Sequence, residues 1–148
     1  MSPHFGLMDE NKMTPEDAAL MRAKLHWRCG KRRLGEKKSA SGIATLYDAL
    51  LSGMRWYILT GQAARPEDFS AEDLENERYV FHLLKKAGLI DSSLNLARIQ
   101  DLVDRALMDE NIRAEQAWFF AELEKFLTRL KVLPFDESAL PPEEPATF

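Results

Sequence analysis

The sequence contains few of the residues that build covalent or metal-bound sites. Cys29 is the only cysteine among 148 residues, which excludes an internal disulfide framework and a zinc site made of several cysteines. Glycine-rich phosphate-binding patterns of the P-loop and dinucleotide types are absent. Di-iron helical bundles place a glutamate three residues before a histidine, and neither His26 nor His82 has one there. We therefore expect no metal and no other cofactor.

Long apolar runs and a strong excess of one charge are missing as well. No segment approaches the roughly 20 apolar residues that span a bilayer. Residues 1–10 have neither the basic start nor the apolar core of an export signal. We therefore expect no membrane association and a cytoplasmic location. The net charge of −4 argues against strong non-specific binding to nucleic acid.

Apolar side chains recur at three- and four-residue spacings through most of the chain, and this spacing predicts helices. No segment alternates apolar and polar residues for long enough to predict a strand. The sequence therefore predicts an all-α fold, an up-and-down bundle of about five helices. The first three predicted helices cover residues 14–35, 39–60 and 70–87. The fourth follows a cap at Asp91-Ser92-Ser93, and the fifth ends before Pro134.

Local signals support these helix ends. Thr14 precedes Pro15 in the order that is typical of a helix start, and Ser70 with Asp73 matches a capping box. Cys29 falls on the apolar stripe of the first predicted helix. We expect it to be a small buried side chain and not a nucleophile.

The two ends of the chain lack helical spacing. Residues 1–13 mix proline, glycine and polar residues, so we expect a flexible leader before a helical-bundle domain at residues 14–133. Residues 134–148 contain prolines and acids but few apolar side chains, so they bury too little surface to offset the entropy of ordering. We expect this acidic tail to be disordered.

Basic residues are concentrated in one short stretch of this acidic protein. Between Arg22 and Lys38 there are eight basic residues and one acid, which leaves the other residues with a balance of −11. One interpretation is a phosphate-binding surface for RNA or DNA. The other is a solvated helix face whose cations pair with the acidic remainder of the chain. The candidate binding residues are Lys31, Arg32, Arg33, Lys37 and Lys38.

Arg78 and His82 are two further candidate binding residues. They are four residues apart, so a helix would place them one turn apart on one face. As a catalytic pair they would serve a nuclease, with His82 in acid–base chemistry. The alternative is that both are ordinary partners for the acids at residues 72–77.

Several segments together resemble the helical bundle of HEPN-like domains over about residues 14–133. The matching features are the helix order, the small or apolar positions, and the segments Gly35-Glu36-Lys37-Lys38-Ser39-Ala40, Leu46-Tyr47-Asp48-Ala49-Leu50, His82-Leu83-Leu84 and Arg113-Ala114-Glu115-Gln116-Ala117. The resemblance implies an up-and-down bundle that is often dimeric. Members occur beside nucleotidyltransferases or act in RNA-directed defence and toxin–antitoxin systems.

The catalytic residues of the family cannot be transferred. The ribonuclease branch carries an arginine followed after four to six residues by a histidine, late in the bundle. Here only three residues separate Arg78 from His82, and the pair lies too early in the chain. The resemblance therefore implies a member of the non-catalytic type.

The leading hypothesis is a non-enzymatic interaction module that forms a homodimer and binds a partner protein, such as a nucleotidyltransferase, or a nucleotide. Trp56, Trp118 and Phe120 are the aromatic residues that an interface would use as anchors. The alternatives are an RNA- or DNA-binding protein that uses the segment Arg22–Lys38, and a HEPN-type ribonuclease that uses Arg78 and His82.

Overall fold

A computed structural model describes residues 2–91 and 94–148, and within them the fold is all-helical without a strand. The prediction of an all-α bundle is confirmed. The described residues form six α-helices and three short 3-10 helices. The α-helices are α1 (Pro15–Gly35), α2 (Ser39–Leu59), α3 (Ala71–Glu75), α4 (Glu77–Lys86), α5 (Leu96–Leu107) and α6 (Arg113–Arg129); the 3-10 helices are η1 (Glu10–Lys12), η2 (Glu137–Ala139) and η3 (Pro145–Thr147).

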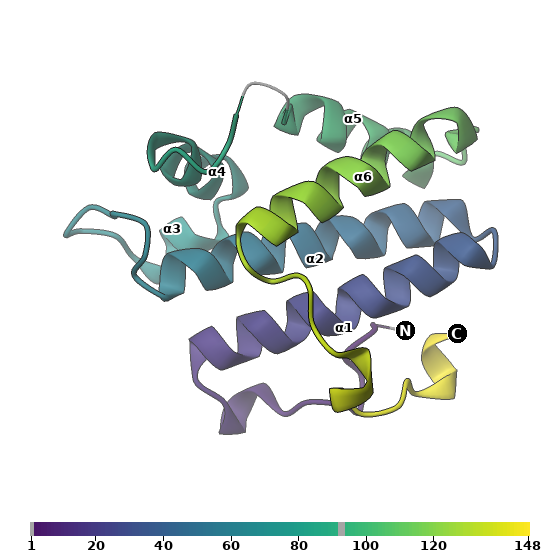
Figure 1. Ribbon diagram of the computed structural model, residues 1–148, viewed down its shortest axis with the longest axis horizontal. Coiled ribbons are helices and arrows are strands. Elements are labelled where there is room, and N and C mark those ends of the chain that lie inside the picture. The colour runs from purple at the N-terminus through teal and green to yellow at the C-terminus, as the bar shows by residue number, and fades with distance from the viewer. Residues whose placement is uncertain (1, 92–93) are drawn as a thin grey trace.

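Helices α1 and α2 run side by side as a long hairpin, and α4, α5 and α6 lie on the other side of α2 from α1 (Figure 1). Two glycines let the helices approach closely. A Cβ atom on Gly30 would lie 2.6 Å from the side chain of Leu46, and one on Gly42 would lie 2.6 Å from the side chain of Leu34. These glycines therefore serve close packing inside helices, where glycine would otherwise weaken the helix.

Helix α2 is the centre of the bundle. It packs against α1 on one side and against α4, α5 and α6 on others. The core around it is built from large apolar side chains that are fully buried: Ile43, Leu46, Leu50, Met54, Ile58, Leu84, Ile99, Leu102, Phe119, Leu123 and Leu127. Cys29 is also buried, as predicted, and is 1% exposed.

The third predicted helix, residues 70–87, is divided into α3 and α4. The backbone of Asn76 is extended, with φ −85° and ψ 103°, so it ends one helix and begins the next. Its side chain accepts a hydrogen bond from the amide of Tyr79, as a cap does. The predicted capping box of Ser70 and Asp73 is present. The cap that we predicted at residues 91–93 extends outside the described residues, and the N-cap of α5 is Asn95.

The two ends of the chain lie beside α1, as Figure 1 shows. The C-terminal segment (residues 135–148) forms η2 and η3, and Thr147 is only 1% exposed. This corrects the expectation of a disordered tail. The expectation counted apolar surface alone, whereas the acids of the segment meet the basic residues of α1 as ion pairs, for example Lys31 with Glu137. Prolines also reduce the conformational entropy that the segment loses when it docks.

Candidate functional site

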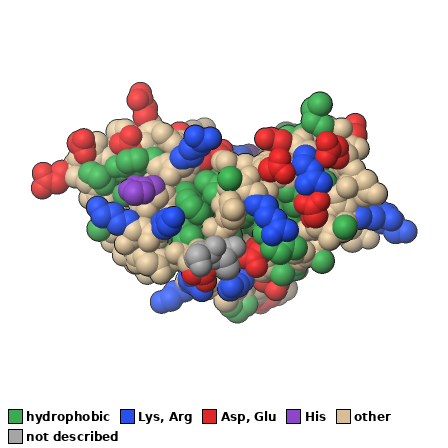
Figure 2. All heavy atoms as spheres, turned by 90° about the horizontal axis from the view of Figure 1, so that it is seen from above, with side chains coloured by type: hydrophobic (Ala, Val, Ile, Leu, Met, Phe, Trp, Pro, Cys, Tyr) green, Lys and Arg blue, Asp and Glu red, His purple; other side chains and the backbone are tan. Residues whose placement is uncertain are grey.

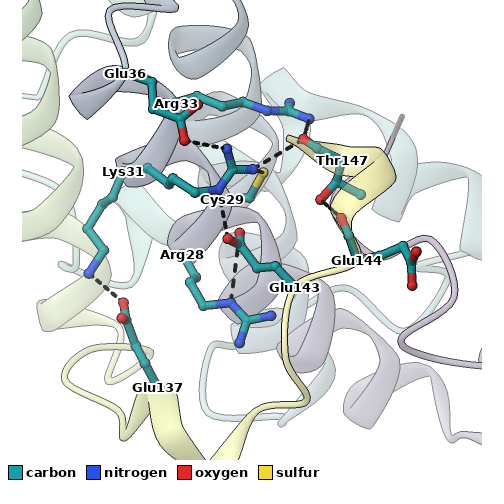
Figure 3. A network of polar contacts seen from close by, with 10 residues as sticks. Arg28, Cys29, Lys31, Arg33, Glu36, Glu137, Glu143, Glu144 and Thr147 are labelled. Carbon is teal, nitrogen blue, oxygen red and sulfur yellow. Dashed lines mark hydrogen bonds and ion pairs between the residues drawn. The ribbon is translucent and has the colours of Figure 1, made fainter.

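Three arginines of α1 contact the C-terminal segment. Figure 3 shows two of them, Arg28 and Arg33, beside Glu143 and Thr147. Arg28 and Arg32 lie one helical turn apart, and Arg33 follows directly, so their guanidinium groups reach the same side of α1. We call Arg28, Arg32 and Arg33 the arginine cluster. The sequence predicted Arg32 and Arg33 as binding residues, but it did not single out Arg28.

The cluster holds the C-terminal segment through a carboxylate, a backbone carbonyl and an aromatic ring. Nε of Arg32 donates to Oε2 of Glu143 at 2.7 Å. Nη2 of Arg32 and Nη2 of Arg33 both donate to the carbonyl oxygen of Thr147, at 3.2 and 2.8 Å. The guanidinium of Arg32 also lies 4.4 Å from the ring centroid of Phe148. Arg32 therefore contacts every part of the segment that the cluster binds.

These charges are largely removed from solvent. The side chains of Arg28, Arg32 and Glu143 are 13%, 19% and 15% exposed. Burial would lower the pKa of Arg32, but its hydrogen bonds to Glu36 and Glu143 outweigh burial and raise that pKa above its ordinary value. Because the charge is permanent, the site favours an acidic occupant at every physiological pH.

One contact within the site is incomplete. Nε of Arg28 and Oε1 of Glu143 are both buried and lie 4.0 Å apart, too far for a hydrogen bond. Neither atom has a hydrogen-bond partner among the described residues. The C-terminal segment therefore leaves one donor and one acceptor of the site unsatisfied.

The other predicted basic residues divide between two places. Lys31 pairs with Glu137 of the C-terminal segment, next to the arginine cluster. Lys37 and Lys38 lie in the turn between α1 and α2, where Lys38 pairs with Glu36 at 3.0 Å. The structure therefore brings three of the five predicted residues against the C-terminal segment and leaves two in the turn.

Arg78 and His82 are both exposed on α4, one turn apart as predicted. Neither makes a hydrogen bond or an ion pair with a described residue, so no converging carboxylate orients the histidine. Figure 2 shows the face over α4, α5 and α6, where acidic and basic side chains alternate with small apolar areas. The structure does not join this pair to the arginine cluster, because α4 and α1 contact different sides of α2.

The predicted aromatic anchors already have partners within the chain. Phe120 stacks on Trp27 with ring centroids 5.0 Å apart. The guanidinium of Arg98 covers Trp118 at 3.6 Å, and Trp56 meets the edge of Tyr57. These contacts are the ordinary packing of a bundle.

Four polar side chains form a second cluster, which the sequence did not predict. His26 of α1, which is 4% exposed, lies between His4 of the leader and Asp48 of α2. Nδ1 of His26 is 2.7 Å from Oδ2 of Asp48, and Nε2 is 3.1 Å from Nδ1 of His4. Arg22 donates two hydrogen bonds to the same Asp48 carboxylate. The four residues come from three separate segments, so no sequence motif joins them.

Electrostatics in this second cluster favours an ionised Asp48. Burial would raise the pKa of Asp48, but the contacts from His26 and Arg22 hold that pKa well below its usual range. The Ser2 hydroxyl lies 2.9 Å from Nδ1 of His4. The cluster therefore fastens the leader to the hairpin of α1 and α2.

Three further findings bear on function. Within residues 2–91 and 94–148, no three or more histidine, cysteine or acidic side chains are grouped to hold a metal ion. None of the helices there is both long enough and apolar enough to cross a membrane.

Comparisons of the chain with protein-family models, with curated proteins and with solved structures find no match. The resemblance to HEPN-like domains therefore stays a prediction.

Proposed function

We propose that the protein is a non-enzymatic helical interaction module that binds an acidic segment of a partner protein through the arginine cluster of α1. The observation that carries the proposal is the convergence of Arg28, Arg32 and Arg33 on one short stretch of the C-terminal segment, between Glu143 and Thr147. Arginine suits this role because its planar group donates several hydrogen bonds in fixed directions and remains charged.

The chemistry around the cluster supports binding more than catalysis. Cys29 is the thiol beside the cluster, and Arg32 donates to its sulfur at 3.3 Å. Burial is the main reason that the pKa of Cys29 lies above its ordinary value, so the thiolate, which is the reactive form, is disfavoured.

Binding to RNA or DNA has less support. The cluster binds a backbone carbonyl and an aromatic ring as well as a carboxylate, and a peptide offers this combination whereas a phosphate backbone does not. The nucleic-acid alternative and the ribonuclease alternative both stay predictions. The homodimer is also a proposal, since a second copy of the chain carries the same acidic segment.

Exchange of charge between two full-length variants tests the proposal. In the first variant, Arg28→Glu and Arg32→Glu reverse the cluster, which then repels its own Glu143. In the second, Glu143→Arg reverses the segment, which is then repelled by its own cluster. We expect the mixture to form a species heavier than either variant alone in sedimentation velocity, because the reversed segment fits only the reversed cluster.

A chain with Glu144→Arg is the matched control for the second variant. It carries the same change of charge one residue away, and the Glu144 carboxylate points away from the arginines in Figure 3. Mixing this control with the cluster variant should give no heavier species. A cognate mixture that stays unassociated at 100 μM, about the range of weak peptide binding, would show that the cluster does not bind such a segment between molecules.

A further inference from the structure

The contacts of the C-terminal segment define which features of a ligand the arginine cluster can read. Arg32 contacts the Glu143 carboxylate, the Thr147 carbonyl and the Phe148 ring. Along the segment, Thr147 comes four residues after Glu143 and Phe148 comes five residues after it. The spacing depends on the 3-10 helix Pro145–Thr147, in which the hydroxyl of Thr147 donates to the carbonyl of Glu144 at 2.7 Å.

We infer that the partner ligand is an acidic peptide with a glutamate four residues before a buried threonine and five before an aromatic residue, and that it competes with the chain's own C-terminal segment. This inference rests on the proposed function and names its ligand and its regulation. A peptide is favoured over a polyphosphate, because the cluster donates two hydrogen bonds to a backbone carbonyl and the guanidinium of Arg32 lies over an aromatic ring. A polyphosphate has neither group.

The chain's own segment is suited to displacement. It leaves Arg28 Nε and Glu143 Oε1 without hydrogen bonds, so an external carboxylate placed closer to Arg28 would make a contact that the internal one lacks. Phe148 is 59% exposed although it lies on Arg32. Two surface hollows, of about 370 and 390 Å³, flank Phe135 where the segment begins, so this part of the chain is thinly packed.

Competition follows from the covalent connection. An internal ligand on a short tether is present at an effective concentration in the millimolar range, so an external peptide of similar affinity binds poorly while the internal one is docked. Weakening the internal segment alone should therefore strengthen external binding. This gain distinguishes regulation by the segment from simple attraction between opposite charges.

The experiment uses the full chain and a fluorescent synthetic peptide with the sequence of residues 137–148. Fluorescence anisotropy should show peptide binding on the order of tenfold tighter to the Glu143→Gln chain than to the wild-type chain. A Phe148→Ala chain provides a second weakened segment. It should show the same direction of change, and circular dichroism checks that both variants remain helical.

Variants of the peptide test the register of recognition. Replacing Glu143 by glutamine in the peptide, or Phe148 by alanine, should weaken binding to the Glu143→Gln chain on the order of tenfold, since each removes a contact of Arg32. Replacing Glu144 by glutamine is the matched control, because it removes the same charge without removing a contact, and it should leave the affinity unchanged.

The outcomes separate the two proposals. If the Glu144→Gln peptide weakens as much as the Glu143→Gln peptide, recognition depends on net charge and the inferred register is wrong, while the proposed function stands. If wild-type and Glu143→Gln chains bind the peptide equally, the segment does not compete and the inferred regulation is wrong. The charge-exchange mixture tests the proposed function independently of both.

Discussion

Nδ1 of His4 lies 3.1 Å from Nε2 of His26, and the two rings stack with their centroids 5.4 Å apart. A hydrogen bond between two ring nitrogens needs one proton, on either atom. A second proton would bring two N–H groups face to face. The contact is therefore stable with one proton between the two nitrogens, and a second proton there separates the two rings.

Acidification should release the leader from α1. Burial, followed by the charges of Arg22 and His26, lowers the pKa of His4 below its ordinary value of 6.5, while the acids Glu10 and Asp48 oppose this. The undocked leader thus binds more protons than the docked one as pH falls below 6.5. Docking is therefore complete above that pH and is progressively lost below it. Amide NMR shifts of residues 4–8, followed from pH 7.5 to 5, measure the loss.

Substitutions of His4 and His82 separate this effect from general acid unfolding. His4→Ala should give leader shifts at pH 7.5 that match the undocked wild type. His82→Ala removes an exposed histidine on α4 and should leave the titration unchanged. Leader shifts that stay constant to pH 5 would show that the histidine contact does not hold the leader.

The substitution Asp48→Asn should destabilise the fold by about 2 kcal/mol at pH 7, because hydrogen bonds to a charged group contribute that much. It removes the charged acceptor of both Arg22 hydrogen bonds and the carboxylate that lies 2.7 Å from Nδ1 of His26. The pKa of Asp48 is lowered by folding, so its contribution is present above the ordinary value of 3.8 and lost as pH falls below it. Urea denaturation of both chains at pH 7 and at pH 3 measures the difference.

A carboxylate elsewhere provides the comparison for Asp48. Glu124 is exposed on α6, and Glu124→Gln should change the free energy of unfolding by less than about 0.5 kcal/mol. An Asp48→Asn chain that is as stable as the Glu124→Gln chain would contradict the role assigned to this ion pair.

The substitution Gly30→Ala should destabilise the protein by about 1–3 kcal/mol, the usual cost of overpacking. The new methyl group would lie 2.6 Å from the Leu46 side chain and 3.2 Å from its backbone nitrogen, so α1 and α2 would have to separate. Gly35→Ala, near the end of the same helix, meets nothing within 4 Å. Thermal unfolding should therefore show a clear loss for Gly30→Ala only, and equal melting temperatures would refute the close approach.

Cys29 should report whether the C-terminal segment is docked. The thiol is 1% exposed and burial raises its pKa, so we expect slow alkylation by iodoacetamide in the wild-type chain at pH 7.5. Arg32, which holds Glu143 of the segment, also donates a hydrogen bond to the thiol sulfur at 3.3 Å. Glu143→Gln should increase the alkylation rate several-fold, whereas Glu144→Gln should not. Equal rates in the two variants would mean that the segment does not protect Cys29.

Spacing and local caps were enough to predict most of the helices. Apolar residues at helical spacing identified the hairpin of α1 and α2. The predicted cap at Thr14 is present, because its hydroxyl accepts a hydrogen bond from the backbone amide of Asp17. The break at Asn76 was not predicted, because the apolar spacing continues through it and only the backbone conformation shows the change. Apolar spacing and caps could be predicted because each depends only on residues that are close together in the sequence.

The candidate site was only partly predictable. The excess of basic residues on the first helix was visible, and so was the acidity of the C-terminal residues, but their pairing joins positions such as Arg32 and Glu143 that are more than a hundred residues apart. The same is true of His4, His26 and Asp48, which no motif connects.

The sequence by itself determined the all-α class, the long hairpin and the absence of a multi-cysteine site, because each depends on local spacing or on composition. Only the tertiary structure decided that the acidic tail docks on α1, that Arg28 joins Arg32 and Arg33, and that the rings of His4 and His26 meet. The physical reason is that charge pairing and hydrogen bonding act between atoms a few ångströms apart, and those distances exist only after the helices have packed.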